Sequence, residues 1–216
     1  MKAWYRDYWA QTWYSNTFLV RRPRQIAQTV DADRDWNNVY DSGCNFTCIA
    51  MIVGIDPAYL ASILSTQRFF YADNTLTSQR LSGKRGGLVW DRNAPNAELR
   101  HITLTSLWHP RRRCRVTVTA RFVESIVTRN YREGLRVVAA MHAAGGHVVC
   151  GTEEHSHLVA GTIDEDFALW DPDDTVVDVE TNLSGGFTLR HLFQKYRGEA
   201  VEFWHYECDI SEQRSR

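Results

Sequence analysis

The sequence lacks a long uninterrupted run of apolar residues. None of its apolar stretches approaches the ~18 residues that a membrane-spanning helix requires. The first seven residues, MKAWYRD, also lack the continuous apolar core of a signal peptide. We therefore expect a protein that is cytoplasmic when made and that has no membrane partner.

An excess of charge of one sign is also missing. The 25 Lys and Arg residues nearly balance the 26 Asp and Glu residues, so the formal net charge is −1 at pH 7. A protein without a positive excess has no long-range attraction for a phosphate backbone. We therefore expect no nucleic-acid partner.

The cysteines lack the even number and regular spacing of a disulfide framework. Five cysteines among 216 residues are better explained as free thiols in a reducing compartment. Internal repeats are absent too, whereas 44% of the residues are hydrophobic and 12% are aromatic, which suffices for a packed core. We expect one domain over residues 1–210, with an irregular N-terminal extension at 1–36 packed on it and a frayed tail at 211–216.

Apolar patterns and turn residues predict where the helices and strands lie. Helices are predicted over 44–54, 58–69, 122–132 and 189–196. Strands are predicted over 101–107, 115–120, 135–141, 147–151, 157–162, 167–170, 175–179 and 200–206. Helices followed by runs of strands, without βαβ alternation, indicate an α+β fold with an antiparallel sheet in its C-terminal part.

Cys44 stands at the predicted start of the helix 44–54 and is the candidate nucleophile. Unpaired N–H groups and the positive end of the helix dipole favour a thiolate at that position. Gly43 lets an incoming carbonyl approach the sulfur closely. Cys48 lies one turn further on and is predicted to be a buried core residue.

A nucleophilic thiol needs a base, and the base needs a group that orients it. His157 begins one predicted strand, and Asp171 follows the next. A tight turn at 164–166 would pair the two strands antiparallel and bring the start of the first beside the end of the second. Asp171 could then hold one ring nitrogen of His157 while the other nitrogen faces Cys44.

Three motifs resemble those of papain-like cysteine peptidases of the C39-like group: GCNFTCIAM at 43–51, HLVAG at 157–161 and LWDP at 169–172. In that group the first motif carries the nucleophile, the second the base and the third the orienting carboxylate. The resemblance spans roughly residues 37–206. It implies a papain-like fold and a cysteine peptidase with Cys44, His157 and Asp171 as its catalytic triad.

The resemblance also implies partners and a setting. The chain is similar to papain-like toxin modules that bacteria deliver into other cells by a secretion system and that an immunity protein holds inactive in the producer. This implies a protein or peptide substrate in a target cell and a cognate inhibitor. Two other functions stay open, namely transglutamination or deamidation of glutamine by the same triad, and a catalytically inactive binding module.

The oxyanion hole departs from the pattern of the group. Such enzymes place a Gln a few residues before the cysteine, and this chain has none between Thr29 and Cys44. Asn38 is the candidate amide donor and Asn37 its competitor. A loop-forming role for both Asn residues is an equal alternative.

Histidines gather near Cys150, and a zinc site is the alternative interpretation of that stretch. His147, Cys150, His155 and His157 match no tight ligand spacing. We therefore expect no metal and no cofactor.

Negative charge is concentrated in residues 151–180. The stretch holds ten Asp and Glu residues and no Lys or Arg. Its negative potential would attract cations, so we expect a substrate or partner with a basic segment to bind near Asp164, Glu165 and Asp166. A solvated loop surface is the alternative.

Overall fold

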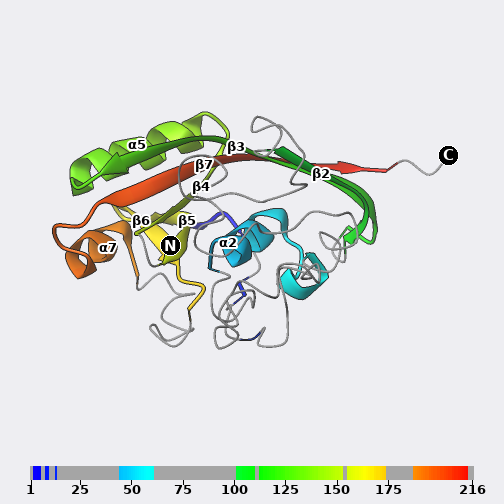
Figure 1. The fold of residues 1–216 in the computed structure, drawn as a ribbon, viewed down its shortest axis with the longest axis horizontal. Helices are drawn as coiled ribbons and strands as arrows, with labels where there is room; N and C mark the ends of the chain where they lie inside the picture. The colour runs from blue at the N-terminus through cyan, green and yellow to red at the C-terminus, as the bar shows by residue number, and fades with distance from the viewer. Residues whose placement is uncertain are drawn as a thin grey trace, which may run out of the picture.

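The computed structural model has the predicted α+β class, with helices on both faces of one antiparallel sheet (Figure 1). It describes residues 2–5, 8–9, 13, 44–60, 101–109, 112–152, 155–173 and 187–213. The helices within these residues are α2 (Cys44–Val53), α5 (Tyr131–Ala143) and α7 (Leu189–Lys195), and residues 57–60 add a helical turn. None of the described helices is both long and apolar enough to cross a membrane.

Within the described residues, seven strands form the sheet, and all their pairings are antiparallel. They are β1 (Lys2–Ala3), β2 (His101–His109), β3 (Cys114–Thr128), β4 (His147–Gly151), β5 (Ser156–Ile163), β6 (Asp166–Trp170) and β7 (Val201–Glu212). Their order is β1-β5-β4-β7-β3-β2, and β6 pairs with β5. Strands β5 and β6 form a hairpin, which brings the start of β5 beside the end of β6, as predicted.

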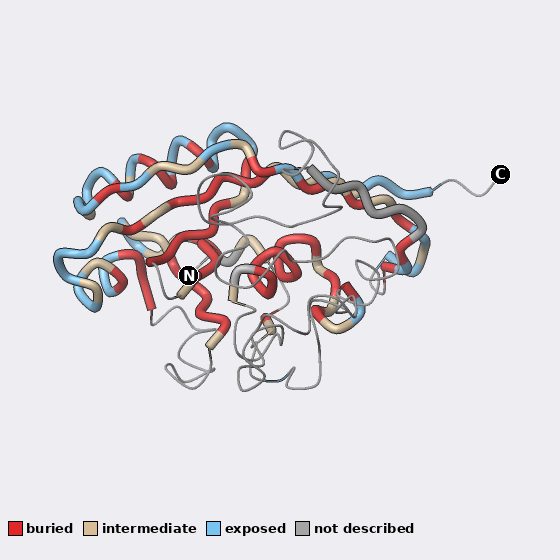
Figure 2. The backbone as a smooth tube through the Cα atoms, in the orientation of Figure 1, coloured by how far each residue is buried: buried red, intermediate tan, exposed pale blue. Residues whose placement is uncertain are grey.

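Each face of the sheet has its own apolar core. Helix α2 packs on one face, here the α2 face, while α5 and α7 pack on the other, here the α5 face (Figures 1 and 2). Neighbouring residues of a strand point to opposite faces. In β4, Val149 therefore belongs to the α2 core, and Val148 and Cys150 belong to the α5 core.

Helix α2 is apolar around its whole circumference and is buried, as predicted. Phe46, Ile49 and Met51 are each at most 1% exposed. No acidic residue stands in its first turn and no basic residue in its last. The helix ends where Gly54 adopts a positive φ of 68°, a conformation that glycine reaches without strain. Burial against the sheet thus places the N-terminus of α2, with Cys44, at the edge of the core.

The prediction of a helix over 122–132 is wrong. Strand β3 continues to Thr128, and its residues from Phe122 onward pair with β7 as far as Val201. The apolar residues of this segment fit a helical spacing, but the neighbouring strand β7 supplies backbone partners that favour the extended form. Burial alternates along most of β3, as expected for a strand with one covered face.

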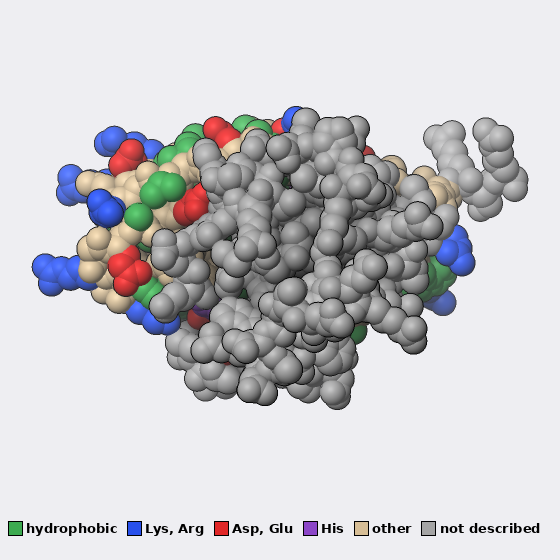
Figure 3. All heavy atoms as spheres, viewed as in Figure 1, with side chains coloured by type: hydrophobic (Ala, Val, Ile, Leu, Met, Phe, Trp, Pro, Cys, Tyr) green, Lys and Arg blue, Asp and Glu red, His purple; other side chains and the backbone are tan. Residues whose placement is uncertain are grey.

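The prediction of a strand over 135–141 is wrong as well, because the segment lies inside α5. Asn130 caps the helix, and its side chain accepts hydrogen bonds from the N–H groups of Arg132 and Glu133. Residues 134, 137, 138 and 141 are buried, which is the spacing of one helix face. The outer surface over α5 and α7 carries Lys and Arg side chains (Figure 3).

The other predicted elements agree with the structure within a few residues where they are described. Strand β4 has the predicted bounds, while β2, β5, β6, α7 and β7 differ from the predicted ones by a few residues at their ends. Strand β7 extends to Glu212, so the first two residues of the predicted tail pair with β3. The predicted strand 175–179 and the end of the predicted helix 58–69 lie outside the described residues.

The described residues of the N-terminal segment are more regular than the predicted extension. Lys2 and Ala3 pair with Thr162 and Gly161 of β5 and so form an edge strand. The Trp4 ring stacks on the His142 ring with 3.8 Å between centroids. Tyr8 is buried in the α2 core. The beginning of the chain is therefore part of the packed domain.

Candidate active site

Cys44 is the first residue of α2, and its half-buried thiol contacts the start of β5. Hydrogen bonding with His155 and Ser156 lowers the pKa of this thiol. Burial by itself would raise the pKa of Cys44, but these hydrogen bonds and the charge of His155 lower it below that of an ordinary thiol. The N-terminal position on a helix favours the thiolate further.

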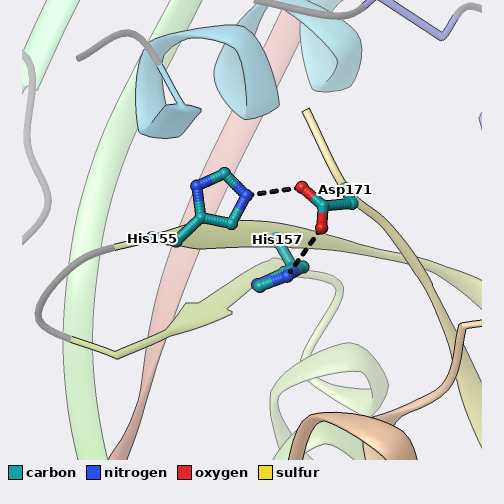
Figure 4. A group of neighbouring side chains, drawn as sticks. All are labelled: His155, His157 and Asp171. Atoms are coloured by element: carbon teal, nitrogen blue, oxygen red, sulfur yellow. Dashed lines mark hydrogen bonds and ion pairs between the residues drawn. The ribbon is translucent and has the colours of Figure 1, made fainter. Parts of the chain in front are cut away.

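His155 lies in the connection just before β5 and contacts both Cys44 and Asp171. Its Nε2 is 2.5 Å from Oδ1 of Asp171 (Figure 4). Burial would lower the pKa of His155, but the hydrogen bonds to Asp171 and Cys44 and the charges of both raise it to about 10. The imidazole is therefore protonated at neutral pH and faces a thiol with a lowered pKa, which is the arrangement of a thiolate–imidazolium pair.

Asp171 follows the last residue of β6, and its side chain is fully buried. Oδ1 also accepts the backbone N–H of Asp173 at 2.9 Å, and the backbone carbonyl accepts the hydroxyl of Tyr8 at 2.6 Å. Burial would raise the pKa of this carboxyl, but the hydrogen bonds and charges of His155 and His157 hold it well below its usual range. The lowered pKa favours the ionised form of Asp171 at neutral pH.

His157, the base expected from the sequence, occupies a different position from the expected one. Its side chain is fully buried within β5, with Nε2 3.3 Å from Oδ2 of Asp171. Its ring stacks on Phe187, with 5.2 Å between centroids. Among the described residues, the imidazole that hydrogen-bonds with Cys44 is that of His155. The structure brings Cys44 and Asp171 together, as predicted, but it does so through His155.

From the sequence alone, His155 is a candidate only for the zinc cluster. His155 and His157 are two residues apart, and residues at that spacing lie on the same face of an ideal strand. Their spacing in the sequence therefore does not show which of the two imidazoles faces Cys44. The deciding feature is that β5 begins at Ser156, so His155 lies outside the strand and can turn toward α2.

The predicted oxyanion residue Asn38 and its competitor Asn37 lie outside the described residues. The backbone of α2 supplies another type of donor. The first N–H groups of a helix have no partners within the helix and point outward at its N-terminus. Cys44 is the first residue of α2, so these N–H groups belong to the same helix turn and could stabilise a negative oxygen formed during acyl transfer at the sulfur.

Three residues of the site also form the group best suited to a metal ion. His155, His157 and Asp171 each offer a donor atom, and these atoms lie within 4.8 Å of one another. Two donors on a tetrahedral zinc ion lie roughly 3.3 Å apart, whereas His155 and Asp171 are 2.5 Å apart. The short distance between His155 and Asp171 fits a hydrogen bond between them. His147 and Cys150, which the sequence also offers as zinc ligands, do not belong to this cluster of described residues.

The other cysteines differ from Cys44 in their surroundings. Cys48 is completely buried in the α2 core, as predicted, and burial and the charge of Cys44 raise its pKa. Burial also raises the pKa of Cys150, and it raises that of Cys208 to about 12. Cys44 thus has a lowered pKa, whereas burial makes these three thiols poor nucleophiles.

The acidic turn proposed to attract a basic partner lies away from the thiol. Asp164 and Glu165 are exposed at the β5–β6 turn, whereas His155 and Asp171 lie at the opposite end of that hairpin. Asp166 accepts hydrogen bonds from the backbone N–H groups of Phe167 and Arg190. Glu153, Glu154 and the acidic residues of 174–180 lie outside the described residues.

The chain matches no family model, no curated protein and no solved structure. The geometry around Cys44 therefore provides the main basis for a functional assignment. That geometry consists of a thiol with a lowered pKa at a helix N-terminus, an imidazole in contact with it and a buried carboxylate behind the imidazole.

Proposed function

We propose that the protein is a cysteine peptidase with a Cys44–His155–Asp171 triad. The observation that carries this proposal is that His155 contacts the Cys44 thiol and the Asp171 carboxylate at once. A nucleophile, a base and an orienting carboxylate in this chain of contacts are the parts that thiol-based acyl transfer requires. His155 takes the role that the sequence analysis gave to His157.

The reaction begins with attack of the Cys44 thiolate on a peptide carbonyl carbon, which forms a tetrahedral intermediate. The N–H groups at the start of α2 stabilise its oxyanion. As the C–N bond breaks, the His155 imidazolium gives its proton to the leaving amine, and a thioester to Cys44 remains. Neutral His155 then takes a proton from water, and the resulting hydroxide attacks the thioester. Collapse of the second intermediate releases the acid and restores the thiolate and the imidazolium.

The papain-like resemblance supports this proposal in its helix and in its order of residues. Cys44 begins a buried helix, His155 directly precedes β5, and Asp171 directly follows β6, the neighbouring antiparallel strand. On the same resemblance we propose a protein substrate, a role as a toxin delivered into other cells and a cognate immunity protein. Expression of the wild type and of Cys44→Ala in a bacterial cytoplasm tests this role, because only the wild type should arrest growth.

The activity itself is tested with Cys44→Ser and the matched control Cys114→Ser, since both thiols are half-buried. A cell lysate treated with the wild type or the control should gain new peptide N-termini, and Cys44→Ser should produce at least about 10³-fold fewer. Full activity of Cys44→Ser would contradict the proposal. Mass spectrometry of the same samples separates peptide cleavage from deamidation, which adds one dalton, and from isopeptide cross-linking.

A further inference from the structure

Asp171 contacts two imidazoles, one with each carboxylate oxygen. His155 reaches Oδ1 at 2.5 Å, and His157 reaches Oδ2 at 3.3 Å (Figure 4). The two rings lie edge to face, with 4.7 Å between centroids and 84° between planes. A Cys–His–Asp triad uses only the first of these contacts, so the second imidazole has no role in the mechanism described above.

The surroundings of His157 keep its imidazole neutral. Its side chain is completely buried, and it faces His155 and Asp171 on one side and the α5 core on the other. Burial lowers the pKa of His157 to about 4; the hydrogen bond and charge of Asp171 oppose this shift, and the positive charges of His155 and of Lys195 on α7 add to it. A neutral imidazole carries one N–H, so it can donate one hydrogen bond without adding a second cation beside Asp171.

The position of His157 leaves Asp171 as the partner for that N–H. Within the described part of the chain neither ring nitrogen of His157 meets the geometry of a hydrogen bond, and Nε2 lies 3.3 Å from Oδ2 of Asp171. Stacking on Phe187 holds the ring in place. This contact is longer and less well aligned than the one made by His155, as suits a group that supports the carboxylate and does not exchange protons with it.

We propose that His157 is a positioning residue, whose neutral imidazole donates Nε2–H to Oδ2 of Asp171 and thereby holds Oδ1 toward His155. This inference rests on the proposed Cys44–His155–Asp171 triad. Without His157, the contacts of Oδ1 with His155 and with the backbone N–H of Asp173 remain, but Oδ2 loses its imidazole neighbour, so the carboxylate is held less firmly toward the His155 imidazolium. When the protonated form of His155 is less stabilised, a smaller fraction of Cys44 is thiolate at acidic pH.

The test measures the alkylation of Cys44 by iodoacetamide as a function of pH, followed on the Cys44 peptide by mass spectrometry, so no substrate is needed. The variants are His157→Leu, which removes the donor, and His157→Gln, whose amide N–H can reach the place of Nε2. We expect the midpoint of the wild-type profile to lie below that of a free thiol. In His157→Leu the midpoint should rise by about one pH unit, which lowers the rate roughly tenfold at pH values below both midpoints. His157→Gln should restore most of this loss.

The control Val159→Ala shortens a buried side chain two residues further along β5. It should lower the melting temperature and leave the pH profile of Cys44 in place. If His157→Leu does not fold, His157→Phe, which keeps an aromatic ring against Phe187, makes the same comparison.

Some results would overturn only the positioning role of His157, and another would overturn the triad as well. A reactive wild-type Cys44 whose profile is unmoved in folded His157→Leu overturns the positioning role alone. An equal loss of Cys44 alkylation rate in His157→Leu and His157→Gln, with an unchanged midpoint, also overturns the positioning role. His157 would then act by packing only. A wild-type Cys44 that reacts no faster than Cys114 and Cys208 at about pH 6 overturns the triad, and the positioning role with it.

Discussion

The two faces of the sheet have different contents. At its edge the α2 face holds half-buried titratable groups, namely the Cys44 thiol and the His155 imidazole. The α5 face holds an apolar core under an amphipathic helix with a local cap, and its buried imidazole, His157, lies against Phe187. Reactivity is thus concentrated on one face, while the other face provides stability.

Asp171 is where the two faces meet. One of its oxygens contacts His155, which faces α2, and the other contacts His157, which stacks on a residue of the α5 core. Burial of an ionised carboxylate is costly unless hydrogen bonds compensate it. Contacts from both faces offset that cost, so the α5 face contributes to the geometry of the proposed triad.

Among the substitutions that test the difference between the two faces, Asp171→Asn should have the largest effect on activity and on the reactivity of Cys44. The amide keeps the shape but removes the charge that stabilises the His155 imidazolium. Peptidase activity should fall by about 10²–10⁴-fold. The alkylation profile of Cys44 should shift toward higher pH by more than in His157→Leu, because both faces lose the carboxylate. Near-UV circular dichroism checks that the fold is retained, and an unchanged alkylation profile would contradict the role of Asp171.

A smaller effect is expected from Met141→Ala on the opposite face. Met141 is 2% exposed in the α5 core, and its truncation should lower the free energy of unfolding by about 2–4 kcal/mol. Chemical denaturation measures this loss. Cys44 should keep its alkylation rate at neutral pH below the unfolding transition, because the side chain does not contact the triad. A change in the pH midpoint would show that the two faces are coupled more widely than through Asp171.

The smallest effect is expected from Asn130→Ala. The Asn130 side chain accepts hydrogen bonds at 2.9 and 3.2 Å from two N–H groups at the start of α5. Its loss should lower the free energy of unfolding by about 1 kcal/mol, with no change in Cys44 reactivity. Arg136→Ala on the exposed side of the same helix is the control and should change stability by less than half as much. Equal losses in both variants would argue against the cap.

Local patterns in the sequence were sufficient for several elements. The helix at Cys44, the strand 147–151 and the hairpin that precedes Asp171 are predicted from apolar runs and turn residues alone. They were insufficient between Phe122 and Met141. There the patterns predict a helix where the structure has a strand, and then a strand where it has a helix. In that stretch the pairing of β3 with β7 outweighs the helical spacing of the apolar residues, and local propensity does not contain a distant strand.

In the candidate site, too, some features are predicted by the local sequence and others depend on distant residues. A cysteine at the start of a buried helix and an aspartate at the end of a strand are visible in the chain itself, because both depend on where an element begins or ends. The choice between His155 and His157 depends on which ring turns toward α2, and contacts between residues more than 100 positions apart decide that. Only the folded chain therefore assigns His155 to the thiol and leaves His157 on the far oxygen of Asp171.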